Sequence, residues 1–100
     1  AIVVFTETGT TARKLSRFRP NVPIIALTED SKVRDELCLS YGVVPLVMDF
    51  PDGDIVSVEP IIEHLKSMKV VEKGQRLLFI HGHRWREPGL TNTLSVKEVR

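Results

Sequence analysis

A chain of 100 residues is long enough for one domain built around a single hydrophobic core. Hydrophobic residues make up 42% of the chain and charged residues 27%, which is typical of a folded globular protein and excludes a disordered one. The formal net charge of +1 provides no overall field that would attract nucleic acid or a membrane. Any anion site therefore has to be local.

The single cysteine, Cys38, excludes an internal disulfide and fits a reducing compartment, so we expect a cytoplasmic protein. We interpret Cys38 as a small core residue without chemistry of its own. No apolar run approaches the ~20 residues of a membrane span. Because the chain starts without Met and directly in strand residues, we expect 1–100 to be one domain cut from a longer protein.

The chain opens with the apolar run Ala1–Phe5, which predicts a buried strand of a parallel sheet. A hydroxyl-rich stretch follows at Thr6–Ala12 (TETGTTA), and a helix is predicted over about Thr11–Phe18. The first N–H groups of a helix lack internal partners and attract anions, while Gly9 allows close approach of the backbone. The stretch therefore fits a phosphate seat, and it also fits an ordinary turn with a threonine cap.

This first helix should end before Pro20 and place Ala12, Leu15 and Phe18 inward. Its basic residues form a local cluster, which a solvated helix face explains better than an anion site. The basic residues are Arg13, Lys14, Arg17 and Arg19.

A second short strand is predicted at Pro23–Leu27, followed by a helix capped by Asp30 or Ser31. Apolar residues recur at four-residue spacing along that helix, and Gly42 provides a C-terminal stop. These apolar residues are Val33, Leu37 and Tyr41. A third strand at Val43–Met48 contains Pro45, which suits the edge of a sheet better than its centre.

The acidic stretch Asp49–Asp54 is predicted to be a loop, and its spacing does not fit a calcium-binding loop. A third helix should start at Asp54 or Ser57, with Pro60 in its first turn and His64 near the surface. Its apolar stripe comprises Val58, Ile61, Ile62, Leu65 and Met68.

After a turn at Glu72–Gln75, a fourth strand is predicted at Leu77–Ile80, and a polar loop follows at His81–Leu90. The last run, Thr91–Val99, alternates like an antiparallel edge strand. The fold class is therefore α/β, a three-layer α/β/α sandwich. We expect a mostly parallel five-stranded sheet in the order 3-2-1-4-5 with the last strand antiparallel.

In such a sheet, ligands bind beyond the carboxyl ends of the strands where the order reverses, here between strands one and four. We therefore expect the TETGTTA stretch and the polar loop His81–Leu90 to meet at one site. His83, Arg84 and Arg86 can bond phosphate, and Trp85 offers a flat face for a sugar or base. His81 and His83 lack a third ligand at a sensible spacing, so we expect no metal site.

After the opening strand, residues 6–28 contain a T-x-[ST]-G-x-[ST]-A loop, a Y/F-R-P helix end and a P-I-[IL]-A strand. In this order they resemble the start of the C-terminal domain of pyruvate kinases. Ser40–Pro45 resembles its helix end, Glu72–Gln75 its K-G-D turn, and Thr91–Thr93 its closing G-x-T-N-T strand. The resemblance covers nearly the whole chain in the right order.

The resemblance implies a domain separate from the catalytic barrel, which contributes to a homotetramer and in many members binds a phosphorylated sugar such as fructose 1,6-bisphosphate. The parent enzyme it implies transfers phosphate from phosphoenolpyruvate to ADP with magnesium and potassium. This chain alone contains none of the catalytic residues, and no cofactor is expected in it. By position, the effector phosphate-binding residues would be Thr6, Thr8, Gly9, Thr10, Thr11, His83, Arg84 and Gly89.

The chain departs from the family pattern in three places. Glu7 puts a carboxylate in the phosphate loop, His83 stands where relatives often have Trp, and Ser57 stands where several bisphosphate binders have Arg. A bisphosphate effector, a monophosphate effector and no effector all remain open. The alternatives are a structural domain that serves only tetramer contacts, or a stand-alone sugar-phosphate-binding module.

Overall fold

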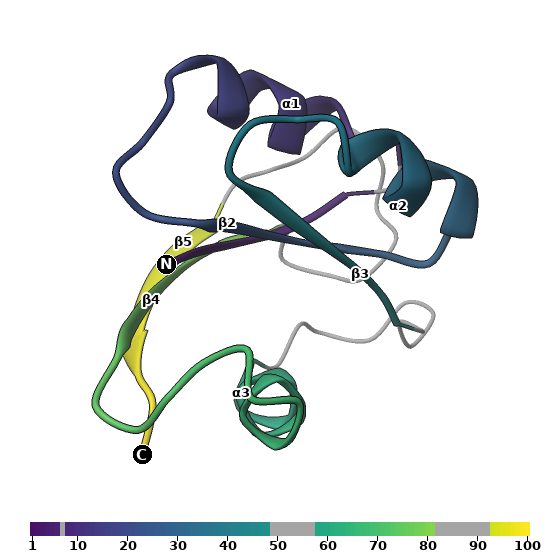
Figure 1. The fold of residues 1–100 in the computed structure, drawn as a ribbon. Helices are drawn as coiled ribbons and strands as arrows, with labels where there is room; N and C mark the ends of the chain where they lie inside the picture. The colour runs from purple at the N-terminus through teal and green to yellow at the C-terminus, as the bar shows by residue number, and fades with distance from the viewer. Residues whose placement is uncertain (7, 49–57, 82–92) are drawn as a thin grey trace.

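The computed structural model describes residues 1–6, 8–48, 58–81 and 93–100. Five strands and three helices alternate along these residues in the predicted order (Figure 1). The elements are β1 (Ile2–Phe5), α1 (Thr10–Arg17), β2 (Ile24–Thr28), α2 (Ser31–Leu37), β3 (Val43–Val47), α3 (Glu59–Ser67), β4 (Arg76–His81) and β5 (Thr93–Glu98).

The sheet has the strand order β3-β2-β1-β4-β5, as predicted. Strand β1 pairs in parallel with both β2 and β4, so Val3 lies between Ile25 and Phe79. The last pair, β4 and β5, is antiparallel. Pro45 belongs to β3 at the edge of the sheet, where its missing N–H is tolerated, and this prediction is also confirmed.

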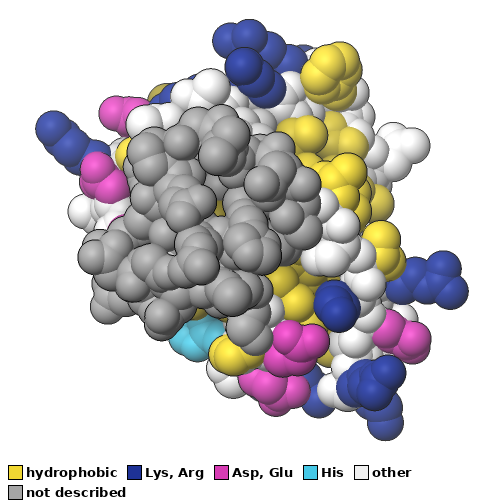
Figure 2. All heavy atoms as spheres, turned by 180° about the vertical axis from the view of Figure 1, so that it is seen from behind, with side chains coloured by type: hydrophobic (Ala, Val, Ile, Leu, Met, Phe, Trp, Pro, Cys, Tyr) yellow, Lys and Arg dark blue, Asp and Glu magenta, His cyan; other side chains and the backbone are white. Residues whose placement is uncertain are grey.

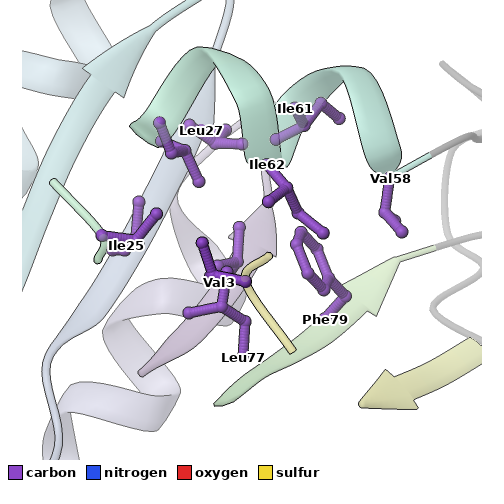
Figure 3. Close-up of a cluster of buried hydrophobic side chains, with 11 residues drawn as sticks. Val3, Ile25, Leu27, Val58, Ile61, Ile62, Leu77 and Phe79 are labelled. Carbon is purple, nitrogen blue, oxygen red and sulfur yellow. The ribbon is translucent and has the colours of Figure 1, made fainter. Parts of the chain in front are cut away.

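Helices α1 and α2 lie on one face of the sheet and α3 lies on the other, which makes the predicted three layers (Figure 1). Successive strand residues point to opposite faces, so each strand contributes to two cores. On the α3 face, Val3, Leu27 and Phe79 pack against Ile61 and Ile62 (Figure 3). The core on the α1 and α2 face comprises Val4, Ala12, Ile24, Ala26, Val33 and Leu37.

Several local signals are confirmed. The Asp30 carboxylate accepts the amide of Lys32 at 2.8 Å and caps α2, and Pro60 lies in the first turn of α3. His64 is exposed, as expected. Gly74 adopts φ +90° in the turn before β4, and its amide donates to the carbonyl of Val99.

Four residues predicted to lie inward are exposed instead. Three of them, Phe18, Cys38 and Met68, are the C-caps of α1, α2 and α3 and lie where each helix ends. Phe18 is 84% exposed and Met68 45%. The fourth, Tyr41, lies beyond α2, which ends at Leu37 rather than near Gly42.

Ser16 takes the place of Phe18 on the buried side of α1. It is 6% exposed, and its hydroxyl donates to the carbonyl of Tyr41 at 2.7 Å. Arg19 and Lys69, which follow two of the C-caps, have φ values of +47° and +60°. The chain therefore reverses sharply after α1 and α3 without the glycine that usually marks such a reversal.

Candidate functional site

The TETGTTA stretch lies at the carboxyl end of β1, in the middle of the sheet. The amide of Thr6 donates to the carbonyl of Leu27 at 2.9 Å, which ties the start of the loop to the end of β2. On its other side, β1 pairs with β4, with Val4 opposite Ile80. The loop therefore lies at the predicted reversal of strand order, where ligands bind in sheets of this kind.

A tight turn centred on Gly9 leads from β1 into α1. The Gly9 amide donates to the hydroxyl of Thr6 at 2.7 Å, and Gly9 itself adopts φ +85°. Thr6 is only 6% exposed, so this hydroxyl is fixed inside the loop. Gly9 is thus required for a left-handed backbone conformation that other residues adopt at a cost.

The residue at the N-cap of α1 is Gly9, not the threonine that an ordinary cap would supply. Glycine has no side-chain acceptor, and no described residue accepts a hydrogen bond from the amides of Thr10 and Thr11. The hydroxyls of Thr8 and Thr10 lie 2.9 Å apart on the exposed side of the turn. The loop therefore presents hydroxyl and amide donors together, which is the chemistry that an anion requires.

A basic side chain that the sequence assigned to a solvated cluster also reaches this loop. Nη1 of Arg13 donates to the carbonyl of Thr8 at 3.0 Å, and Nη2 pairs with Glu36 on α2 at 2.9 Å. Arg13 lies four residues after Gly9, and long helical side chains lean toward the helix N-terminus. That spacing is the sequence signal that could have placed Arg13 at the loop.

The structure places Thr6, Thr8, Gly9, Thr10 and Thr11 in one turn. The other predicted site residues, His83, Arg84 and Gly89, lie outside the described residues, so their contribution stays a prediction. The same holds for Trp85 and Arg86 of that loop, for Glu7 and Ser57, which depart from the family pattern, and for the acidic loop 49–54. Within the described ranges, no group of three or more His, Cys, Asp or Glu side chains could hold a metal ion.

Comparison with known proteins decides the family. The family profile described as "Pyruvate kinase, alpha/beta domain" matches residues 1–97. The chain belongs to this family. It therefore corresponds to the C-terminal domain of pyruvate kinases, as its sequence predicted.

Individual pyruvate kinases are similar over almost the full chain. The enzyme of Dictyostelium discoideum is 36% identical over 98 residues, and that of Clostridium acetobutylicum is 33% identical over 99 residues. The alignments cover 98% and 99% of this chain, but only 19% and 21% of the two relatives. The chain thus spans about a fifth of the pyruvate kinases that it matches.

A solved pyruvate kinase also shares the fold. The crystal structure of a pyruvate kinase from Cryptosporidium parvum matches 99% of this chain with a TM-score of 0.78 and 27% identity. The chain covers 19% of that protein. In the part of the chain that the structure describes, no helix is long and apolar enough to cross a membrane.

Proposed function

We propose that this chain is the regulatory and oligomerisation domain of a glycolytic pyruvate kinase and that its loop at 6–11 binds a phosphorylated sugar. The intact enzyme would transfer phosphate from phosphoenolpyruvate to ADP in a separate catalytic domain, where magnesium and potassium would act. Membership of the pyruvate kinase family supports this assignment.

The observation that carries the effector proposal is the turn at Gly9. Its left-handed backbone starts α1 without a side-chain cap, and no described residue accepts a hydrogen bond from the amides of Thr10 and Thr11. The hydroxyls of Thr8 and Thr10 lie 2.9 Å apart in the same turn. A phosphate group bound there would accept hydrogen bonds from amides and hydroxyls at the positive end of the helix dipole. Fructose 1,6-bisphosphate or a sugar monophosphate is the proposed ligand.

The test is isothermal titration of the intact protein with fructose 1,6-bisphosphate and fructose 6-phosphate, with unphosphorylated fructose as the ligand control. Thr8→Ala should weaken binding about tenfold, because it removes a hydroxyl that donates to a charged oxygen. Arg84→Ala tests the predicted second loop in the same way. Ser67→Ala is the matched control, since its hydroxyl is exposed on α3 and donates to the carbonyl of His64.

Binding of either sugar phosphate that Thr8→Ala weakens and Ser67→Ala leaves unchanged would support the proposal. If neither sugar phosphate binds to the folded, intact protein, the effector part is wrong. The family assignment would be unaffected by that result.

The second candidate is a structural domain that serves only contacts between subunits of a homo-oligomer, with a tetramer expected from the family. It is favoured by β5, an edge strand whose Leu94 and Val96 side chains are 68% and 66% exposed. Apolar side chains on an edge strand suit burial against another polypeptide. Under this alternative, adding sugar phosphates would leave the intact enzyme's dependence on phosphoenolpyruvate unchanged.

A further inference from the structure

Arg13 connects three parts of the molecule through one guanidinium group. It starts from α1, donates to the carbonyl of Thr8 in the loop at 3.0 Å, and pairs with Glu36 on α2 at 2.9 Å. A Cβ added to Gly9 would lie 3.1 Å from Cζ of Arg13. The guanidinium therefore lies directly against the turn that forms the candidate site.

This position is electrostatically unfavourable for a cation. The N-terminal end of a helix carries partial positive charge, so a basic side chain there is repelled where an acidic one would be attracted. Nothing in the first turn of α1 compensates, because that turn contains no acidic residue. Within the described residues, Glu36 is the carboxylate that pairs with Arg13.

The pairing with Glu36 is of the kind that an anion can replace. The Arg13 side chain is 36% exposed and that of Glu36 61%, so water and ions reach both groups. Exposed pairs of this kind add little to stability. A phosphate monoester carries up to two negative charges and three acceptor oxygens, and like a carboxylate it can accept two hydrogen bonds from the guanidinium fork. Glu36 accepts only one, from Nη2.

We propose that Arg13 is a further anion-binding residue of the loop at 6–11 and that Glu36 competes with the bound phosphate for it. The inference rests on the proposed effector function. When a sugar phosphate binds, the Arg13 guanidinium exchanges Glu36 for a phosphate oxygen. Glu36 therefore lowers the affinity of the site and connects its occupancy to α2.

The experiment titrates the intact protein at constant ionic strength with fructose 1,6-bisphosphate, fructose 6-phosphate and inorganic phosphate. Arg13→Gln should weaken sugar-phosphate binding about tenfold, as expected for loss of one charge-assisted contact. Arg13→Lys keeps the charge but lacks the fork, so its affinity should be intermediate. Glu36→Gln should tighten binding by about two- to fivefold, because it removes the competing charge.

Two matched variants separate these effects from general changes in charge. Lys14→Gln removes an exposed positive charge from the residue next to Arg13. Asp35→Asn removes a negative charge next to Glu36, from a carboxylate that pairs with Arg34 instead. Each control should change the affinity by less than about twofold, since exposed charges without a direct contact are screened by salt.

The outcomes distinguish this inference from the function on which it rests. If the unmodified protein binds neither sugar phosphate, both are overturned. If it binds them and Arg13→Gln behaves like Lys14→Gln, the inference alone is overturned. If Glu36→Gln binds sugar phosphate more weakly or equally well, Glu36 does not compete with phosphate for Arg13. Glu36 would then either position Arg13 or play no part in binding.

Discussion

The two faces of the sheet use alternate residues of the same strands, yet they are covered to different extents. On the α3 face, the buried cluster reaches from Ile25 on β2 to Leu77 on β4 and Val99 at the chain end. On the other face, α1 and α2 pack over β2 and β3. Among the described residues, the first core therefore extends across the sheet, whereas the second does not include β5.

Among the described residues, the exposed apolar part of the second face lies on β5. Leu94 pairs with Ile80, which packs against the core beneath α1 and α2, so Leu94 points to that same face. Leu94 and Val96 are nevertheless more than half exposed, and Figure 2 shows hydrophobic side chains at the surface on the rear side of the molecule. On the opposite face of β5, Lys97 pairs with Glu59 of α3 at 3.7 Å.

Both faces therefore carry a buried core, and the difference between them lies in the exposed apolar side chains of β5. Buried apolar side chains on the α3 face stabilise the domain through packing. Exposed ones on β5 contribute little until another polypeptide covers them. Substitutions on the two faces should therefore affect different measurements.

The largest effect is expected from Leu65→Ala on the α3 face. Leu65 is fully buried in α3, so its truncation leaves a cavity and should cost about 2–5 kcal/mol of unfolding free energy. Leu94→Ala is the matched substitution on β5 and should cost less than about 0.5 kcal/mol. Urea unfolding of both variants measures the difference. Equal losses would show that the two faces do not differ as described.

The next effect concerns the loop from which α1 begins. Gly9→Ala introduces a Cβ where φ is +85° and where the Arg13 guanidinium lies 3.1 Å away, so it should cost about 1–2 kcal/mol or more. Gly42→Ala is the control, because its φ of +68° lies within the left-handed region that L-residues can adopt and no atom lies within 4 Å. Urea unfolding of the two variants compares the more strained turn beside Arg13 with a less strained one in open space. A smaller loss for Gly9→Ala than for Gly42→Ala would contradict this account.

A smaller effect is expected at the cap of α2, which covers the second face. Asp30→Ala removes the acceptor for the Lys32 amide and should cost about 1 kcal/mol. Asp35→Ala, an exposed carboxylate further along α2, should cost less than about 0.5 kcal/mol. Unfolding midpoints in urea compare the two variants. If Asp35→Ala costs as much as Asp30→Ala, general charge rather than capping is responsible.

The sequence predicted the sheet order because apolar runs of strand length alternate with helix-length segments, and right-handed crossovers leave few arrangements. It also predicted the loop at Gly9, since a glycine among threonines between a strand and a helix is typical of a turn. These signals are local or follow from general topology.

The predictions from the sequence that were wrong concern residues at the ends of helices. Apolar periodicity placed Phe18 and Met68 inward, but each is a C-cap followed by a non-glycine residue in a left-handed conformation, Arg19 and Lys69. Neither C-cap is followed by the glycine that usually marks a helix end, although Pro20 predicts that α1 stops before it. Similarly, the role of Arg13 depends on Glu36, 23 residues later, and only the packed helices bring the two together.

The smallest effect on stability is expected from substitutions of the exposed residues Leu94 and Val96 on β5, which should also affect assembly. A double variant with Leu94→Ser and Val96→Ser should change the unfolding free energy by less than about 1 kcal/mol, because both side chains are already exposed. It should weaken self-association of the intact protein if β5 lies between subunits, which analytical ultracentrifugation measures directly. Lys97→Gln, on the other face of β5, is the control and should leave association unchanged. If association of the double variant is unchanged, β5 does not lie between subunits. Leu94 and Val96 would then be covered by another segment of the same polypeptide.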